Sequence, residues 1–269
     1  IETLATQKDG GWLMRIYFKH YTGSITQHDY LFFDCMAEVS LNEEDQALEE
    51  GWLPDDYIIK ANSECGIAKS HWFQARQTRI NLSKFSDSSK MRQLRNRCKQ
   101  INTKIFNCKE VDMDLLRTIF HKYLSYKDFK YWDLDKIILS EPSRKHFLIY
   151  YYNDEPVAFT FLREVGSRSI YSVQFAWDYE NPKLYLGKYA NLAEIDYCNS
   201  INANYMYLGV GYENACAYKA DYNGFEFWNG EVWSSDVNTY KELCSRDSDI
   251  KLLSDLEKCK DHDDKYYFK

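Results

Sequence analysis

One stretch of the sequence constrains the fold more than any other. Residues 146–177 contain three strand-like runs joined by two tight turns. The runs are rich in aromatic and β-branched residues, and the turns contain the Asn, Asp, Pro, Gly and Ser that favour chain reversal. A helix-like apolar spacing follows over 188–201, and a further strand over 204–208. This order predicts an antiparallel sheet continued by a helix and another strand, which is a mixed α+β architecture. The three runs cover residues 146–152, 157–165 and 168–177.

Shorter patterns predict the remaining elements. Ser40 followed by Glu43 forms a capping box, so a helix is expected over 41–50. Another helix is expected to start near Ser88. Further strands are expected at 12–20, 30–40 and 71–82 and as a pair between 225 and 233, and further helices at 111–125, within 127–138, at 214–222 and at 249–260. We divide the chain into an N-terminal α/β region over 1–105 and a second domain over 106–269.

Composition narrows the class of protein. The chain has 269 residues, of which 45% are hydrophobic and 28% charged, so a folded domain with a real core is expected. The net charge of −7 excludes a wholly basic nucleic-acid coat protein. A local basic stretch remains, because residues 84–104 hold seven Lys or Arg and a single acidic residue. Such a stretch suits an RNA backbone, and a solvated helix face is the alternative.

The eight cysteines lack the close pairing that metal sites need. Zinc ribbons and iron–sulfur sites require tight ligand pairs, so neither is predicted and the cysteines are expected to be reduced and mostly buried. No run of eighteen apolar residues occurs, so no transmembrane helix is expected. A signal-peptide pattern is also missing at the start, and a cytoplasmic location is expected.

The order of elements resembles the acyltransferase half of the GNAT superfamily. Residues 153–158 are similar to a turn between two sheet strands of that fold, and 217–225 are similar to its A-x-x-x-Y-x-x-x-G-F ending. Over residues 41–230 the chain also resembles the arginyl-tRNA–protein transferases and their bacterial leucyl relatives. Tyr185 stands where the matching family block has Ser. Four blocks in family order carry this resemblance: E-E-G-W at 49–52, Cys65 with the R-I-N-L and basic pattern at 79–92, Y-L-G-K-Y-A-N-L-A-E-I at 185–195, and the Tyr-rich block at 205–222.

The resemblance implies both a fold and an activity. The fold would be a GNAT-like acyltransferase fold, with a mixed, mainly antiparallel central sheet flanked by helices, preceded by an N-terminal α/β extension. The activity would be an aminoacyltransferase that moves an amino acid from aminoacyl-tRNA to an amine acceptor, either a protein N-terminus or another amine. Aminoacyl-tRNA is then the co-substrate. No cofactor, no metal and no membrane partner are expected.

Donor binding is expected at the start of the helix over 188–201 and on the basic stretch. A glycine lets the backbone approach a phosphate closely, and the free N–H groups of a helix start bind anions. A simple turn before the helix is the alternative. The predicted donor-binding residues are Leu186, Gly187 and Lys188, with Lys90, Arg92 and Arg95 from the basic stretch.

Aminoacyl transfer also needs a proton donor for the departing 3′ oxygen and a group that orients the amine. Tyr207, Tyr218 and Tyr222 lie near one strand–helix junction, and a phenol can protonate such an oxygen. Tyr218 is the best single candidate because it occupies the family's Y-K position; for each tyrosine, packing is the alternative. Gln174 lies on the third strand, and Asp178 follows it, where it either orients the amine or caps the loop.

Other interpretations stay open. Glu194 lies in the helix at a family-matched position, as a structural partner or as a base. A GNAT-type N-acyltransferase that uses acyl-CoA on a nucleobase or small amine is a second function, weakened by the single glycine within 183–190. A GNAT fold without catalytic activity, acting as an interaction module, is a third. Copurified RNA would favour aminoacyl-tRNA as donor, and bound CoA would favour acyl-CoA.

Overall fold

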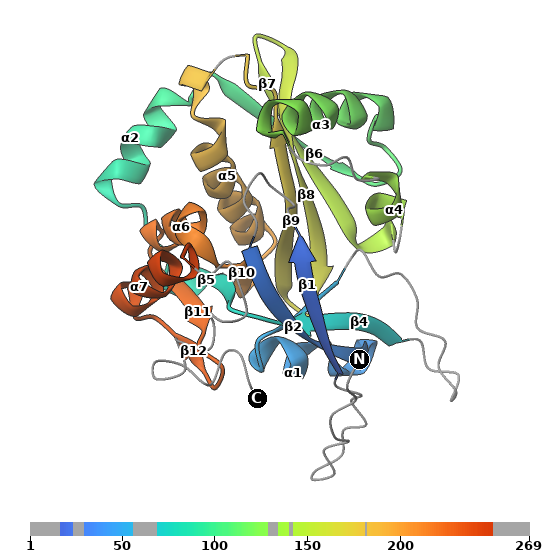
Figure 1. The fold of residues 1–269 in the computed structure, drawn as a ribbon. Coiled ribbons are helices and arrows are strands. Elements are labelled where there is room, and N and C mark those ends of the chain that lie inside the picture. Colours follow the sequence, from blue (N-terminus) through green and yellow to red (C-terminus); the bar gives the residue numbers. More distant parts are fainter. Residues whose placement is uncertain are drawn as a thin grey trace.

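Figure 1 shows the fold in a computed structural model. It describes residues 17–23, 30–55, 69–128, 134–139, 142–180 and 182–249. Most of these residues build one eight-stranded sheet with helices on both faces, and the others build a smaller sheet at one end of it. Within the described parts, every helix is too short or too polar to cross a membrane.

The large sheet has the strand order β12-β11-β5-β10-β9-β8-β7-β6. The predicted run of three strands forms its centre as an antiparallel meander, and β10 then pairs in parallel with β9. All other strand pairs in this sheet are antiparallel, so the sheet is mixed and mainly antiparallel. The strands are β5 (Gln77–Asn81), β6 (Ile101–Asn107), β7 (Lys145–Tyr152), β8 (Glu155–Val165), β9 (Ser169–Trp177), β10 (Tyr205–Val210), β11 (Phe225–Trp228) and β12 (Trp233–Ser234).

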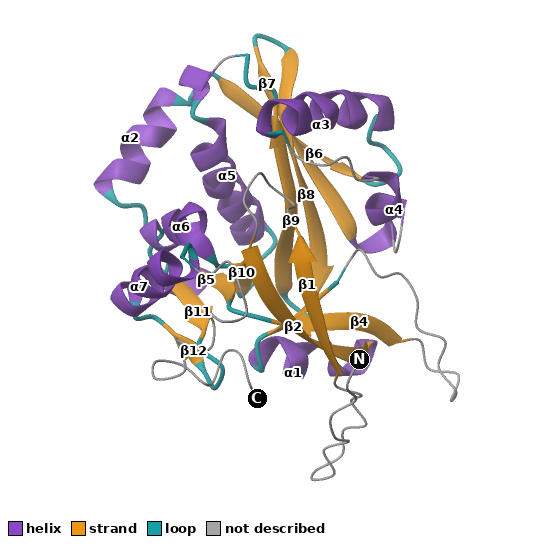
Figure 2. Ribbon diagram, viewed as in Figure 1, coloured by secondary structure: helices purple, strands orange, loops and turns teal. Residues whose placement is uncertain are grey.

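Both faces of the meander are apolar, because successive side chains of a strand point to opposite sides. Phe147 and Ile149 of β7 pack in the cluster that α3 (Met113–Lys127) covers, whereas Leu148 and Tyr150 pack in the cluster that α5 (Leu186–Ser200) covers. Figure 2 shows α3 and α5 on either side of these strands. The sheet is therefore the middle layer of three. The other helical elements are α2 (Ser89–Arg97) beside α5, α4 (Leu134–Leu139), α6 (Glu213–Cys216), the 3₁₀ turn η5 (Ala217–Asp221) and α7 (Val237–Asp247).

The smaller sheet has the order β1-β2-β4-β3 and is antiparallel. Its strands are β1 (Tyr17–Gly23), β2 (Tyr30–Ser40), β3 (Trp52–Pro54) and β4 (Lys69–Gln74). The predicted capping box follows β2: the Ser40 N–H donates 2.9 Å to the Glu43 carboxylate, and the helical turns η1 (Leu41–Glu43) and α1 (Glu44–Glu49) begin there. Trp72 of this sheet and Tyr207 of β10 share one apolar cluster, which joins the two sheets.

Several sequence expectations need correction. Residues 71–82 are two strands in different sheets, because the chain bends between Gln74 and Gln77, where buried Arg76 forms an ion pair with Asp247 of α7. The strand β6 and the helix α7 were not predicted at all. The division at 105/106 stays a prediction; it falls inside β6, and β5 also belongs to the large sheet. The predicted helix at 249–260 lies almost wholly outside the described residues, as does the first part of the strand at 12–20.

Candidate active site

The strands β9 and β10 part after a short contact. They pair in parallel over three residues, from Ser169 to Tyr171 on β9 and from Tyr205 to Tyr207 on β10. Beyond this point β9 continues with β8 as its paired strand and β10 with β5. Beyond this point the main-chain N–H groups on the facing edge of β9 have no paired strand in the described part of the chain, so a bound carbonyl could receive an N–H at the centre of the sheet.

A buried carboxyl group lies on α5 next to this parting. Glu194 is fully buried, and its Oε1 accepts a 2.9 Å hydrogen bond from the Thr160 hydroxyl of β8. The Tyr150 hydroxyl of β7 lies 2.9 Å from the same Thr160 oxygen. Burial raises the pKa of Glu194 to about 7, although hydrogen bonding by Ser172 and Thr160 opposes the shift. Glu194 is therefore a carboxyl group that can change its protonation state near neutral pH.

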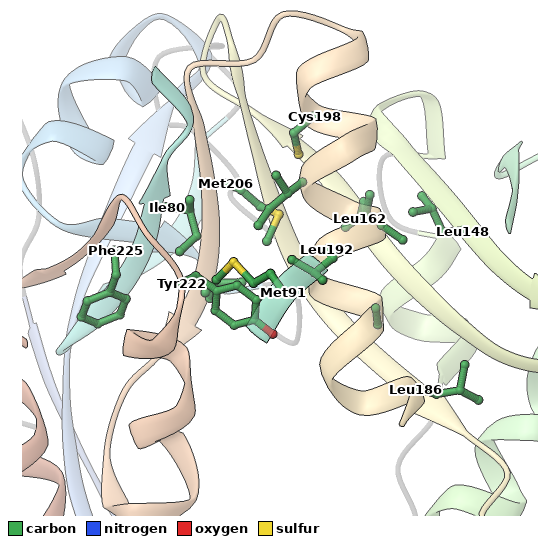
Figure 3. Packing of buried hydrophobic residues seen from close by; sticks show 14 of the residues in the cluster. Ile80, Met91, Leu148, Leu162, Leu186, Leu192, Cys198, Met206, Tyr222 and Phe225 are labelled. Carbon is green, nitrogen blue, oxygen red and sulfur yellow. The ribbon is translucent and has the colours of Figure 1, made fainter. Parts of the chain in front are cut away.

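Two tyrosines from η5 and its end reach the same part of α5. The side chain of Asn191, three residues before Glu194, lies close to the phenols of both Tyr218 and Tyr222. The Tyr222 hydroxyl donates 3.0 Å to the Lys188 carbonyl, and Figure 3 shows its ring among apolar side chains between η5 and α5. Tyr218 is 37% exposed, so it can reach a substrate. Desolvation by the surrounding protein raises its pKa to about 12, with smaller contributions from Cys216 and Glu194.

The first turn of α5 adds a site for anions. Its first N–H groups have no carbonyl four residues earlier within the helix, which makes such a turn electropositive. Among the residues that the structure describes, a Cβ built at Gly187 would meet only Phe175, at 4.0 Å. Lys188 is exposed next to it, whereas the Leu186 side chain is fully buried. Gly187 and Lys188 can thus face a ligand, and Leu186 can contribute through its main chain alone.

A comparison with protein families found a match for the part of the chain that contains this site. Residues 109–229, which contain Glu194, Tyr218, Tyr222 and the start of α5, match the family described as arginine-tRNA-protein transferase, C terminus. The resemblance to the arginyl-tRNA–protein transferases is confirmed. We call residues 109–229 the transferase segment below. No curated protein matches the sequence significantly.

Solved structures with similar folds have very different sequences. One is the C-terminal domain (DUF2156) of a protein described as a lysylphosphatidylglycerol synthetase from Agrobacterium fabrum, at 12% identity and a TM-score of 0.43 over 65% of this chain and 52% of that one. A second is L-PGS from Bacillus licheniformis, at 9% identity and 0.43 over 65% and 53%. A third is FemX, at 10% identity and 0.41 over 66% and 63%. The chain spans about half the length of the first two.

The topology agrees with the predicted fold class. The transferase segment, together with β5 and β6, forms a GNAT-like acyltransferase fold, with a mixed, mainly antiparallel sheet between helices and two parallel strands that part at its centre. The small sheet and α1 form the N-terminal extension.

Three predicted catalytic residues lie away from Tyr218 and Glu194. Tyr207 is buried on the opposite face of β10 from its neighbour Met206, where its hydroxyl accepts a 3.4 Å bond from Arg79. Gln174 pairs with Phe161, which points towards α3, because a bulge in β9 shifts the register. Its amide donates 2.7 Å to the Phe175 carbonyl. The structure therefore does not bring these two residues together with Tyr218 and Glu194.

Asp178 also belongs to the α3 side. Its carboxylate lies 3.7 Å from the ammonium of Lys122 on α3, which in turn contacts Glu180 at 2.7 Å. Desolvation and the charge of Glu180 raise the pKa of Asp178, while Lys122 opposes the shift. An amine that reached Asp178 would have to displace Lys122, so the structure favours the loop-capping alternative.

The basic stretch contains two kinds of cation. Arg95 binds Asp87 at 2.8 Å and, with both terminal nitrogens, Asp196 of α5 at 2.5 and 2.9 Å. This guanidinium holds α2 against α5, so the structure does not support donor binding by Arg95. Lys90 and Arg92 are exposed on the same helix, although Arg92 also donates to the Asp87 carbonyl.

The end of α2 meets the start of α5. The guanidinium of Arg97 lies 5.4 Å from the ring centre of Tyr185, and the Cys98 thiol donates to the Leu184 carbonyl. The basic stretch and the first turn of α5 are consequently one continuous surface. Its exposed cations near this contact are Arg97, Lys99, Lys183 and Lys188.

Asn191 is not predicted from the sequence as a site residue, and Glu194 is predicted only as a structural partner or a base. Both are polar residues three positions apart on a helix whose other buried side chains are almost all apolar. Residues with this spacing share one face of a helix, so two polar groups on a buried face were the available signal.

Proposed function

We propose that this chain transfers an amino acid from aminoacyl-tRNA to an amine acceptor. The observation that carries the proposal is the position of Tyr218, a partly exposed phenol beside Asn191 and near the buried Glu194, where β9 and β10 part inside the transferase segment. A protein N-terminus or another primary amine would be the acceptor. Cytoplasmic action and the lack of a further cofactor stay predictions.

The reaction asks for few protein groups. The neutral amine attacks the ester carbonyl carbon, the new C–N bond forms, and the bond from that carbon to the ribose oxygen breaks. One proton leaves the amine nitrogen and one proton reaches the ribose oxygen, so the net reaction needs no other reactant. The free main-chain N–H groups at the parting of β9 and β10 would stabilise the oxyanion.

Tyr218 would supply the proton to the ribose oxygen. Its raised pKa keeps the phenol protonated at neutral pH, and Glu194 contributes to that shift. Tyr222 would instead position the start of α5, because its hydroxyl is engaged with the Lys188 carbonyl. The exposed cations at the end of α2 and the first turn of α5 would bind the phosphates of the tRNA.

The test is a side-by-side donor assay. Purified protein is given a panel of labelled aminoacyl-tRNAs and a panel of acyl-CoAs, each with a peptide and a small amine as acceptors. Transfer from at least one aminoacyl-tRNA supports the proposal, and the same assay on Tyr218→Phe should show a large loss. Transfer from acyl-CoA alone would favour the second function, and RNA binding without transfer from any donor would favour the interaction module.

A further inference from the structure

Lys219 is a buried lysine beside the candidate active site that the proposed chemistry does not use. Lys219 follows Tyr218 directly on η5, and only 8% of its surface is exposed. Its ammonium donates one 2.7 Å hydrogen bond to the Leu208 carbonyl and another of 2.7 Å to the Val210 carbonyl. Both acceptors are main-chain oxygens of β10, so the Lys219 side chain from η5 binds one edge of this strand.

The direction of these carbonyls shows which edge is involved. The N–H of Gly211, directly after β10, donates 2.8 Å to the carbonyl of Arg76, directly before β5, so the main chain of Gly211 faces β5. Neighbouring residues of an extended strand point their main-chain groups to opposite edges, so the Val210 carbonyl points away from β5. Leu208 points the same way, because one ammonium binds both oxygens.

That edge is the one that β9 has left. The strand order places β5 on one side of β10 and β9 on the other, and the pairing with β9 ends at Tyr207. Leu208 and Val210 come directly after this point. Buried carbonyls need a donor, and in an ordinary sheet the next strand would supply it. Here a lysine side chain supplies it instead.

We infer that Lys219 is a positioning residue that keeps β10 apart from β9 and thereby holds Tyr218 in the parting. Without the ammonium, two buried carbonyls would seek other donors, and the open edge of β9 is the neighbouring source. Closer pairing of the strands would remove the space for an ester carbonyl and would displace the adjoining tyrosine. The kinetic part of this inference rests on the proposed function.

Two variants and a matched control test the inference. Lys219→Met keeps the length of the side chain and removes all donors, whereas Lys219→Arg keeps charge and donors. Lys241→Met is the control, because Lys241 is an exposed lysine of α7 paired with Asp221. We expect Lys219→Met to lower kcat at least 100-fold while its Kd for aminoacyl-tRNA stays within twofold of wild type. Lys219→Arg should stay within tenfold of wild type in kcat, and Lys241→Met should be unchanged.

Hydrogen exchange separates positioning from simple stabilisation. In Lys219→Met, amides over 172–177 should exchange more slowly as the strands close, while those of β6 should be unchanged. Unchanged exchange over 172–177 together with wild-type kcat would overturn the inference, even if the melting temperature falls. If Lys219→Met does not fold, Lys219→Arg decides: wild-type exchange supports the inference and altered exchange over 172–177 overturns it. If the wild type transfers no amino acid, the proposed function fails, and the exchange data still decide the role of Lys219.

Discussion

Tyr218 and Tyr222 carry the same hydroxyl group in different settings. The Tyr222 hydroxyl donates to the Lys188 carbonyl and its ring is buried, whereas Tyr218 keeps 37% of its surface exposed. A proton donor must reach its substrate, so the exposed phenol suits catalysis and the buried one suits support. Replacing each tyrosine with Phe, which removes the hydroxyl oxygen alone, can therefore separate these roles.

We expect Tyr218→Phe to lower kcat by about 100- to 10,000-fold, the usual contribution of a positioned general acid. Its stability should barely change, because removal of the hydroxyl leaves ring packing intact. Tyr222→Phe should instead lower stability by about 1 kcal/mol because its hydrogen bond is removed, with a smaller effect on kcat. Steady-state kinetics and urea denaturation of both variants, with Tyr207→Phe as the control away from the site, measure the difference. Normal turnover by Tyr218→Phe would show that it only packs.

Glu194 makes the stability of the protein depend on pH. Its pKa in the folded protein is about 7, against an ordinary value of 4.5, so the folded state holds this proton more tightly than the unfolded chain. Stability from this group is fully present below pH 4.5 and is lost as the pH rises through about 7. The shift corresponds to about 3 kcal/mol.

We therefore expect wild type to lose about 3 kcal/mol relative to Glu194→Gln between pH 4 and pH 8, because Gln has no proton to lose. Urea unfolding of both proteins across this range measures the difference, and Glu164→Gln, at a partly exposed carboxylate, is the control. A constant difference between wild type and Glu194→Gln would show that Glu194 does not titrate in this window.

At the scale of elements, α2 shows that a run of basic residues in the sequence does not reveal what each residue binds. Seven basic residues in a short stretch predicted an RNA-binding segment, yet Arg95 is engaged by two carboxylates, one of them 101 positions along the chain. No local pattern could identify Asp196 as that partner. Lys90 and Arg92 remain exposed on the same helix.

Charge reversal should separate these two roles. Lys90→Glu with Arg92→Glu should weaken binding of tRNA and reduce the slope of log K against log salt by about one for each phosphate that is no longer bound, with little change in melting temperature. Arg95→Glu should lower the melting temperature, because it places a third carboxylate beside Asp87 and Asp196. Filter binding over a salt series and thermal melts check both expectations. An unchanged salt slope for the double variant would remove this face of α2 from the RNA-binding surface.

The first turn of α5 allows a second test at this scale. We expect Gly187→Val to fold normally, because a Cβ at this position meets only Phe175, at 4.0 Å, within the described part of the chain. The added side chain would occupy the space where a phosphate approaches the main chain, so KM for aminoacyl-tRNA should rise while kcat changes little. A wild-type KM would mean that the donor does not approach this turn.

At the scale of the whole molecule, the sequence revealed local order better than long-range pairing. The meander of β7, β8 and β9 was predicted because tight turns join its strands and period-2 patterns mark them. The insertion of β5 between β11 and β10 was not predicted, because these two strands lie more than 120 residues after β5 in the sequence. The site followed the same rule: Tyr218 came from a local motif, whereas the roles of Thr160, Asn191 and Glu194 depend on which strands α5 covers.

Polar contacts between distant residues also join the two sheets, and Glu44 makes several of them. Glu44 of α1 is 3% exposed, and its carboxylate accepts bonds of 2.7 and 2.6 Å from both terminal nitrogens of Arg144. It also accepts 2.7 Å from the Gly166 N–H in the turn between β8 and β9. A single carboxylate thus links α1 to Arg144, directly before β7, and to the turn between β8 and β9.

We expect Glu44→Ala to lower stability by about 3 kcal/mol, because it leaves a largely buried guanidinium and a main-chain N–H without this acceptor. Asp221→Asn, which breaks an exposed ion pair with Lys241, is the control and should cost at most about 1 kcal/mol. Urea denaturation gives both values, and hydrogen exchange shows where the loss falls. Exchange should rise in β2 and β4 before it rises in β7 and β8, since the small sheet loses its anchor while the meander keeps its own pairing. Equal stability of the two variants would mean that apolar contacts around Trp72 and Tyr207 join the sheets without help from Glu44.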